Sequence, residues 1–169
     1  LFRSFASGPS PFDFTRSIIS FTHETRLSSA DDGRWEWLTG VYLAWRAEDF
    51  VSTLMGPDSS GMPILGRMES REDRANEAAL FGEVTYRFTP ELSLIAGARA
   101  FYADHIVKAD RSGLLVSGAS LFKGTSSQSG VAPKLVLSYR PSDTATYYAQ
   151  FSEGYRLGGI NVDGPAGAT

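Results

Sequence analysis

Apolar and polar residues alternate along most of the chain with a period of two, which is typical of β-strands rather than of helices. In the second such segment, Trp35, Trp37, Val41 and Leu43 take odd positions, and Glu36 takes an even one. Turn-forming glycine, proline, serine and aspartate residues separate the segments. The pattern predicts six strands, at about residues 18–28, 34–50, 76–88, 92–103, 131–140 and 145–155.

Charged residues support the division of this sheet into two faces. A strand that is apolar on one side should carry its charges on the other side. Glu153 is the exception, and it lies beside Gly154, where a β-bulge can reset the alternation. We therefore expect one polar face, which carries Glu24, Arg26, Glu36, Arg46, Glu48, Glu77, Glu83, Arg87, Arg99, Lys134 and Arg140.

The connections between the predicted strands alternate in length. A transmembrane β-barrel has this property, because its periplasmic turns are short and its extracellular loops are long. A short helix at residues 66–81, which begin in the first long connection, is an alternative prediction. These residues are rich in alanine and contain a pattern that resembles a capping box. The short connections are residues 29–33, 89–91 and 141–144, and the long ones are about 51–75 and about 104–129.

Aromatic residues of the apolar face gather near the short turns. In a barrel they would form a ring at one level, as expected where a membrane meets water. This ring would contain Trp35, Trp37, Tyr86, Phe88, Tyr139 and Tyr147. Near the long connections, Trp45, Tyr102 and Phe21 are candidates for a second ring.

Composition excludes several classes of protein. A chain of 169 residues has room for one ordinary domain. The net charge of −3 argues against nucleic-acid binding, and the lack of cysteine excludes a disulfide framework, a cysteine zinc site and a thiol nucleophile. No run of about 18 apolar residues predicts a membrane helix. Because the chain begins at Leu1 and all three methionines are internal, we expect a processed start or a piece of a longer protein.

Four stretches of the chain carry a more specific pattern. They are residues 21–29 with 35–42, 79–89 with 92–99, 133–141, and 148–161. The last stretch contains Gly-Tyr-Arg-Leu-Gly-Gly-Ile-Asn at positions 154–161, which resembles the Gly-Tyr-Arg-x-Gly-Gly-x-Asn passage common in iron–siderophore receptors. Together, and in this order, the four stretches resemble the barrel of TonB-dependent outer-membrane receptors.

This resemblance implies an all-β fold: an antiparallel up-and-down transmembrane β-barrel segment of about six strands, which is an incomplete barrel. The family's barrel has 22 strands around a plug domain, so residues 1–169 are expected to be part of the barrel domain, with the plug absent. The implied function is active uptake of a ferric siderophore, or a similar scarce, large nutrient, across the bacterial outer membrane. The implied partners are outer-membrane lipid and a TonB-type energy-transducing complex, which acts through the plug. Neither nucleic acid nor a cofactor is expected.

Two other classes of protein share part of the pattern. A passive outer-membrane porin has the same alternation and loop lengths but lacks the passage at 154–161. A soluble, secreted lipocalin-like barrel would carry its apolar residues inside, and it has eight strands where six are predicted. Both remain alternatives.

Candidate site residues follow from the resemblance and from the charge pattern. We expect Glu24, Arg26, Glu83 and Arg87 to face the lumen and the plug. Arginine suits anionic oxygen ligands, because its guanidinium can bind them through two hydrogen bonds. A purely structural interpretation is open for each group. The lumen-facing charges would be ion pairs of the wall, the charge cluster of the first long connection would be a solvated loop, and the region of Tyr155 and Arg156 would be a glycine-rich bend. The ligand-binding candidates are Arg67, Arg71, Arg74, Arg99, Tyr155 and Arg156.

Catalysis and metal binding find little support in the sequence. His23 and His105 are the two histidines, and neither has a nucleophile or carboxylate at the spacing of a catalytic or metal-binding motif. We therefore expect no enzyme, no catalytic residue and no metal site.

Overall fold

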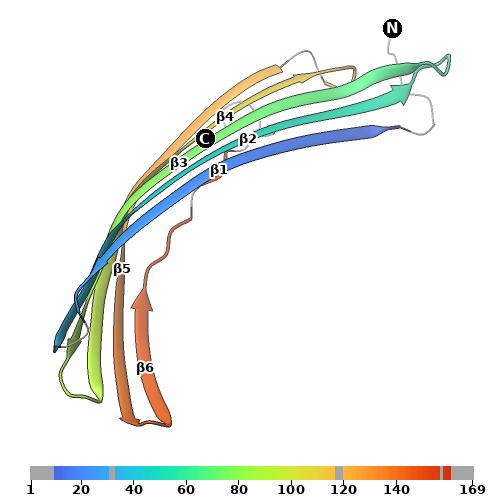
Figure 1. Ribbon diagram of the computed structural model, residues 1–169. Helices are drawn as coiled ribbons and strands as arrows, with labels where there is room; N and C mark the ends of the chain where they lie inside the picture. Colours follow the sequence, from blue (N-terminus) through green and yellow to red (C-terminus); the bar gives the residue numbers. More distant parts are fainter. Residues whose placement is uncertain (1–9, 31–32, 117–119, 157, 161–169) are drawn as a thin grey trace.

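Six strands form one antiparallel sheet, in which each strand lies beside its neighbours in the sequence (Figure 1). The computed structural model describes residues 10–30, 33–116, 120–156 and 158–160. The described part of the chain contains no helix with the length and hydropathy needed to cross a membrane. The strands are β1 Phe12–Ser28, β2 Trp35–Pro57, β3 Pro63–Arg87, β4 Leu92–Ser112, β5 Ser120–Ser142 and β6 Ala145–Ser152.

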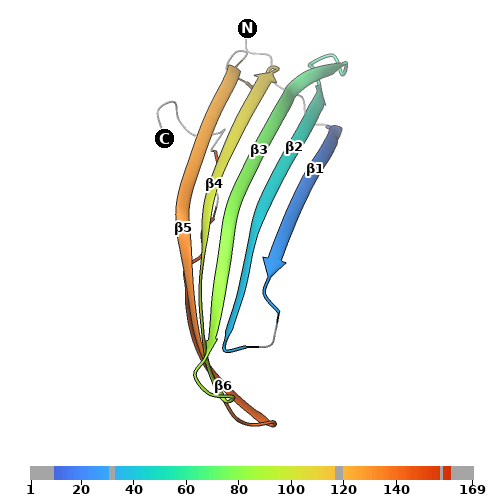
Figure 2. The ribbon, with the colours of Figure 1, turned by 60° about the vertical axis from the view of Figure 1, so that its left-hand side comes forward.

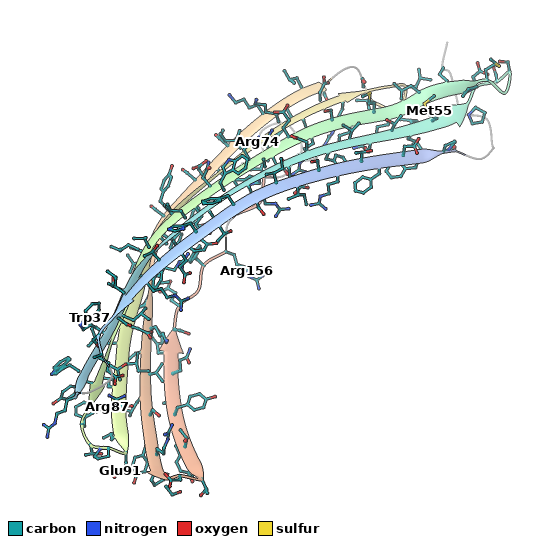
Figure 3. The ribbon with its side chains drawn as sticks, viewed as in Figure 1. Trp37, Met55, Arg74, Arg87, Glu91 and Arg156 are labelled. Carbon is teal, nitrogen blue, oxygen red and sulfur yellow. The ribbon has the colours of Figure 1, made fainter. Side chains whose placement is uncertain are left out.

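The sheet bends into an open arch with a concave and a convex side (Figures 1 and 2). β1 and β6 are its two edges, and the described residues form no pairing between them. Trp37 and Arg74 project from the convex side, whereas Arg156 lies on the concave side (Figure 3). The predicted fold class is confirmed, because the chain forms an all-β, antiparallel, up-and-down sheet that does not close.

Side chains alternate between the two faces, and the register of the strands carries each face across the sheet, with shifts at Leu54/Met55 and at Tyr139/Ser142. On the concave face, for example, Gly40 pairs with Phe81, Phe81 with Arg99, and Arg99 with Ala132. The sequence therefore assigned the polar face correctly. The concave side carries Glu24, Arg26, Glu36, Arg46, Glu48, Glu77, Glu83, Arg87, Arg99 and Lys134.

The convex face carries an apolar band next to the short turns. On β2 the band runs from Trp35 to Ala47, and Asp49 is the next residue on that face. On β4 it runs from Leu92 to Tyr102, where Asp104 follows. The band therefore has a defined upper limit, beyond which the convex face becomes polar.

Aromatic side chains lie at both limits of this band. Next to the short turns, the ring centres of Trp35 and Tyr86 are 4.5 Å apart, and those of Tyr86 and Phe88 are 4.9 Å apart. At the upper limit, Phe21 pairs directly with Trp45 across β1 and β2. These residues of the two predicted aromatic rows thus share one face.

The two long connections predicted from the sequence are wrong. β2 continues to Pro57 and β3 begins at Pro63, so that the turn between them is only residues 58–62. In the same way, β4 continues to Ser112 before β5 begins at Ser120. The helix left open at 66–81 is wrong as well, because that whole range lies inside β3. The last strand ends at Ser152, before the predicted limit of 155.

The extension of β3 escaped prediction because both of its faces are polar. On β3, Arg71 and Asp73 face the concave side, and Glu72 and Arg74 face the convex side. A period-two apolar pattern cannot arise from such a sequence, although the backbone pairs with β2 and β4 throughout. Hydrogen bonds of the backbone and ion pairs between side chains replace the apolar contacts there.

Two glycines on the concave face let aromatic rings lie flat against the sheet. A Cβ atom at Gly40 would lie 2.5 Å from the Phe81 ring and 2.5 Å from the Thr25 carbonyl oxygen. At Gly130, a Cβ would lie 3.2 Å from the Phe101 ring. Both rings cover the glycine that pairs with them across the strands, an arrangement that fixes sheet register.

Candidate functional site on the concave face

The four residues expected to face the lumen all lie on the concave face, and each has a partner of opposite charge. They sit level with the apolar band of the convex face. This part of the wall is therefore polar with its charges largely balanced. The pairs are Arg26 with Glu24, Lys134 with Glu83 at 2.9 Å, and Arg87 with Glu36.

Beyond the apolar band, the concave face carries a second group of ion pairs. Two predicted ligand-binding residues, Arg67 and Arg71, belong to this group, in strand β3 rather than in a loop. Their carboxylate partners reduce the charge that they can offer to a ligand. The pairs are Arg16 with Glu48 at 2.6 Å, Arg46 with Glu48 at 2.5 Å, Arg71 with Asp73 at 2.8 Å, Arg111 with Glu69 at 3.5 Å, and Arg67 with Glu69.

Glu48 lies between two arginines in this group. The hydrogen bond from Arg16 holds the pKa of the Glu48 carboxyl below its ordinary value. Desolvation opposes this change, while the charges of Arg16 and Arg46 add to it. Solvent screens such pairs at an exposed end of a sheet, so each contributes little stability alone.

Arg74, the third arginine of the predicted charge cluster, lies on the opposite face. Its Nη1 atom donates a hydrogen bond to Asp49 Oδ1 at 3.0 Å, on the convex side (Figure 3). Residues three apart in a strand point to opposite faces, so Arg71 and Arg74 cannot line one site. The cluster that looked continuous in sequence is therefore divided between two surfaces.

Two of the other predicted ligand-binding residues, Arg99 and Tyr155, meet at Glu77, in the middle of the concave face. Arg99 Nη2 donates a hydrogen bond to Glu77 Oε1 at 2.8 Å, and the Tyr155 hydroxyl donates to the same oxygen. The rings of Tyr155 and Phe101 stack, with centres 3.5 Å apart and planes inclined by 9°. The Arg99 guanidinium lies 4.6 Å from the ring centre of Tyr42. This cluster links β2, β3 and β4 to a segment that follows β6.

The chain reaches the cluster because it leaves the sheet after β6. The amide of Glu153 still donates a hydrogen bond to the Pro133 carbonyl at 3.0 Å. Residues 153–156, which we call the inward segment, then lie on the concave side (Figure 1). Farther along, Ile160 approaches β5, where a Cβ at Gly124 would meet its Cγ2 atom at 2.6 Å.

Arg156 is the exposed arginine of the inward segment. Its side chain extends on the concave side (Figure 3). No ion pair links it to any residue that the structure describes. Arg26 and Arg99, in contrast, are held by carboxylates of their own sheet. Within the described part of the chain, Arg156 thus differs from these arginines in having no carboxylate partner.

A hollow of about 280 Å³ lies between the chain beyond the inward segment and the concave face. His105, which the sequence placed in a loop, belongs to β4 and lines this hollow. Within the described ranges, no group of three histidine or carboxylate side chains could hold a metal ion. The hollow is lined by Arg46, Glu48, Asp73, Ala75, His105, Gly158 and Gly159.

Sequence reasoning did not single out Glu77, Phe101 or Tyr42 as site residues. One available signal was that Tyr42 and Phe101 are bulky aromatics at positions of the polar face. Glu77 offered no such signal, because it is one of many acids on that face. Its contact with Tyr155 joins residues 78 apart in the chain, which alternation alone does not reveal.

Two comparisons with known proteins bear on this sheet. The chain matches the family model described as TonB dependent receptor-like, beta-barrel, over residues 2–168. It is also similar to the crystal structure of the ferric yersiniabactin uptake receptor FyuA from Yersinia pestis, with a TM-score of 0.80 and 18% sequence identity. That likeness covers 96% of this chain and 25% of the other, so the chain spans about a quarter of FyuA.

Proposed function

The chain belongs to the TonB-dependent receptor β-barrel family, and from that premise we propose that it is part of a receptor for the active uptake of a ferric siderophore or a similar scarce, large nutrient. The barrel would lie in the bacterial outer membrane. Energy would come from the inner membrane through a TonB-type complex and a plug domain. The iron complex would be the transported substrate, and no cofactor is proposed.

The division of the sheet into two chemically distinct faces carries this proposal. On β4 the apolar band spans Leu92 to Tyr102, about 34 Å of strand at about 3.4 Å per residue. A tilt of about 45° reduces its height to about 24 Å, close to the apolar band of about 25 Å in transmembrane barrels. The convex face therefore suits lipid, and the paired charges of the concave face suit a water-filled lumen.

Arg156 is the residue that we propose to contact the substrate. Iron chelates of the siderophore type are often anionic and rich in oxygen, and guanidinium groups bind such oxygens well. Arg67, Arg71 and Arg99 are paired with carboxylates and would line the path. The similarity to a protein titled a ferric yersiniabactin uptake receptor supports an iron–siderophore complex as the substrate class.

A passive porin is the principal alternative, because it would have the same two faces. A lipocalin-like barrel fits less well, since its interior would be apolar and the concave face carries more than a dozen charges. Active and passive passage differ in their need for energy, so an uptake measurement separates the receptor from the porin.

The test uses the full-length receptor that contains this segment, in cells that lack other iron–siderophore receptors. Uptake of iron-55 would be measured with a trianionic tricatecholate complex and with a neutral trihydroxamate complex, with and without TonB. We expect saturable uptake of at least one complex that disappears without TonB. Uptake that persists without TonB, or that rises linearly with concentration, would favour the porin.

Substitutions at two arginines test the binding role. Arg156→Ala should weaken binding of the trianionic complex by roughly 10- to 100-fold, because a hydrogen bond to a charged group is worth about 1.5–3 kcal/mol. Binding of the neutral complex should change little. Arg140→Ala is the matched control, because Arg140 is also exposed but lies beside a short turn. Equal losses for Arg156→Ala and Arg140→Ala would contradict the proposed contact.

A further inference from the structure

Tyr155 and Arg156 are adjacent in sequence but have different surroundings on the concave face. Tyr155 is half-buried, and its ring and its hydroxyl are both in contact with the sheet. Arg156 is exposed and has no partner among the described residues. One residue of the pair is therefore fixed to the wall while the next is directed away from it.

The contacts of Tyr155 come from two strands. Phe101 of β4 supplies the stacked ring, and Glu77 of β3 supplies the hydrogen-bond acceptor. Glu77 is itself held by Arg99, whose Nη2 lies 2.8 Å from the same carboxylate oxygen. A stacked ring and a charge-assisted hydrogen bond act on one side chain, so the position of Tyr155 is well defined.

The wall beneath this contact is unusually closed to solvent. Phe101 is 7% exposed and Ala103 is 1% exposed, although both lie on the concave face of a sheet only one layer thick. Ala103 pairs with Glu77, and Phe101 lies two residues before it on the same face. Tyr155 contacts both of these neighbours of Ala103, so its side chain lies beside the small side chain between them.

Among the described residues, the inward segment has a further contact at its start, where the Glu153 amide donates to the Pro133 carbonyl. A Cβ at Gly154 would meet no heavy atom within 4 Å, and the same is true of Gly159. Glycine gives the backbone on both sides of Tyr155 wide conformational freedom. Without an anchor, the backbone that carries Arg156 would sample many positions.

We propose that Tyr155 is a positioning residue: its contacts with Phe101 and Glu77 anchor the inward segment to the barrel wall and thereby hold Arg156 in the lumen to bind anionic oxygens. Tyr155 itself does not contact the ligand. This inference rests on the proposed function for the role of Arg156. The anchor itself is a property of the fold and does not depend on what the receptor transports.

The anchor can be tested without a ligand, through the reactivity of one introduced cysteine. The 169 residues contain no cysteine, so Ala103→Cys adds a single thiol to this region of the full-length receptor. Its reaction with a water-soluble maleimide requires the covering segment to open, and the rate follows the population of the open state. The variant is compared with Tyr155 intact and with Tyr155 replaced.

We expect the rate at Ala103→Cys to rise about two- to tenfold with Tyr155→Phe, which removes the hydrogen bond. Tyr155→Ala also removes the ring, and should raise the rate by about tenfold more. A cysteine at Ala109, which is 2% exposed and lies six residues farther along β4, is the matched control and should stay unreactive. Unchanged reactivity of Ala103→Cys in both Tyr155 variants would overturn the anchor.

Positioning is then measured by ligand binding. Tyr155→Ala should weaken binding of the trianionic tricatecholate complex, and Tyr155→Phe should restore most of the affinity because the stack remains. The double variant Tyr155→Ala/Arg156→Ala should bind no more weakly than Arg156→Ala alone, since both changes remove the same interaction. Additive losses would show that Tyr155 contacts the ligand itself, and would overturn the positioning role.

The two tests fail separately. If the thiol result is as expected but Arg156→Ala binds the anionic complex normally, the anchor stands and the proposed role of Arg156 is wrong. If Arg156→Ala weakens binding but Ala103→Cys never becomes more reactive, the proposed function stands and the anchor is wrong.

Discussion

An arginine placed in the apolar band should reveal which face of the sheet meets lipid. Val41 is suited to this test, because it lies on the convex face near the middle of the band on β2. Its strand neighbours on that face are Thr25 and Leu80. Its side chain is 43% exposed, so that Val41→Arg disturbs few contacts within the sheet.

The expected cost follows from depth in the membrane. Arginine at the midplane of a transmembrane barrel costs about 2–4 kcal/mol, and the cost falls to about 0–1 kcal/mol near the interfaces. For Val41→Arg this corresponds to roughly a 30- to 700-fold change in the folding equilibrium, at about 1.4 kcal/mol per tenfold. Val51 lies ten residues along the same face, beyond Asp49, and Val51→Arg should cost no more than about 1 kcal/mol.

The assay measures the reversible unfolding of the full-length receptor in phospholipid vesicles by titration with denaturant. Thr22→Arg is the control for the concave face, because Thr22 pairs with Ala44 there and is exposed. It should cost less than about 1 kcal/mol, as expected for a surface substitution facing water. Equal costs for Val41→Arg and Thr22→Arg would refute the assignment of the two faces.

Two further predictions concern the packing and the charges of the concave face. Gly40→Ala should destabilise the fold by about 1–3 kcal/mol, because the added Cβ would meet the Phe81 ring and a backbone oxygen that cannot move away. In the same unfolding assay, the control Gly154→Ala should change the stability by no more than about 0.5 kcal/mol, because its added Cβ meets no atom within 4 Å. The pKa of Glu48 is lower in the folded protein than its ordinary value of 4.5, so its pairing with Arg16 stabilises the protein fully at pH values above 4.5. This contribution is lost as the pH falls through the lower, folded-state pKa. Unfolding free energies of the protein and of Glu48→Gln should therefore differ at pH 7 and converge as the pH falls through the folded-state pKa of Glu48, and a difference that stays constant down to acid pH would contradict this reasoning.

Alternation in the sequence was sufficient to assign the faces of the sheet within the apolar band. Trp35, Trp37 and Val41 lie on the convex face, and Glu36 lies opposite, because a strand that is apolar on one face alone must alternate at every second position. Outside the band the rule weakens. On β3, polar residues occupy both faces: the convex side carries Ser70, Glu72 and Arg74, and the concave side carries Arg71 and Asp73. The sequence of this stretch therefore gives no sign of the strand that contains it.

The candidate site was predicted only in part, and the reason is again physical. Arg99, Tyr155 and Arg156 were identified by charge and by a family passage, and the structure brings Arg99 and Tyr155 onto one carboxylate. Arg74 was grouped with Arg71 because they are near in sequence, although the pleat of the strand separates them. Glu77 was missed because its role depends on its contact with Tyr155. Tyr155 belongs to a segment that leaves the sheet at Glu153, after the end of β6 and 76 residues beyond Glu77.

In the proposed barrel wall, neighbouring residues of one strand face lipid and water alternately. Spin labels in the full-length receptor test this claim most directly. Labels at Val84 and Leu94 would report on the convex face, and labels at Thr85 and Ile95 on the concave face of the same strands. We predict that oxygen dissolved in the bilayer relaxes the first two labels, while a water-soluble nickel chelate relaxes the other two. Equal responses within each neighbouring pair, or the reverse pattern, would contradict the assignment of β3 and β4 to a membrane barrel wall.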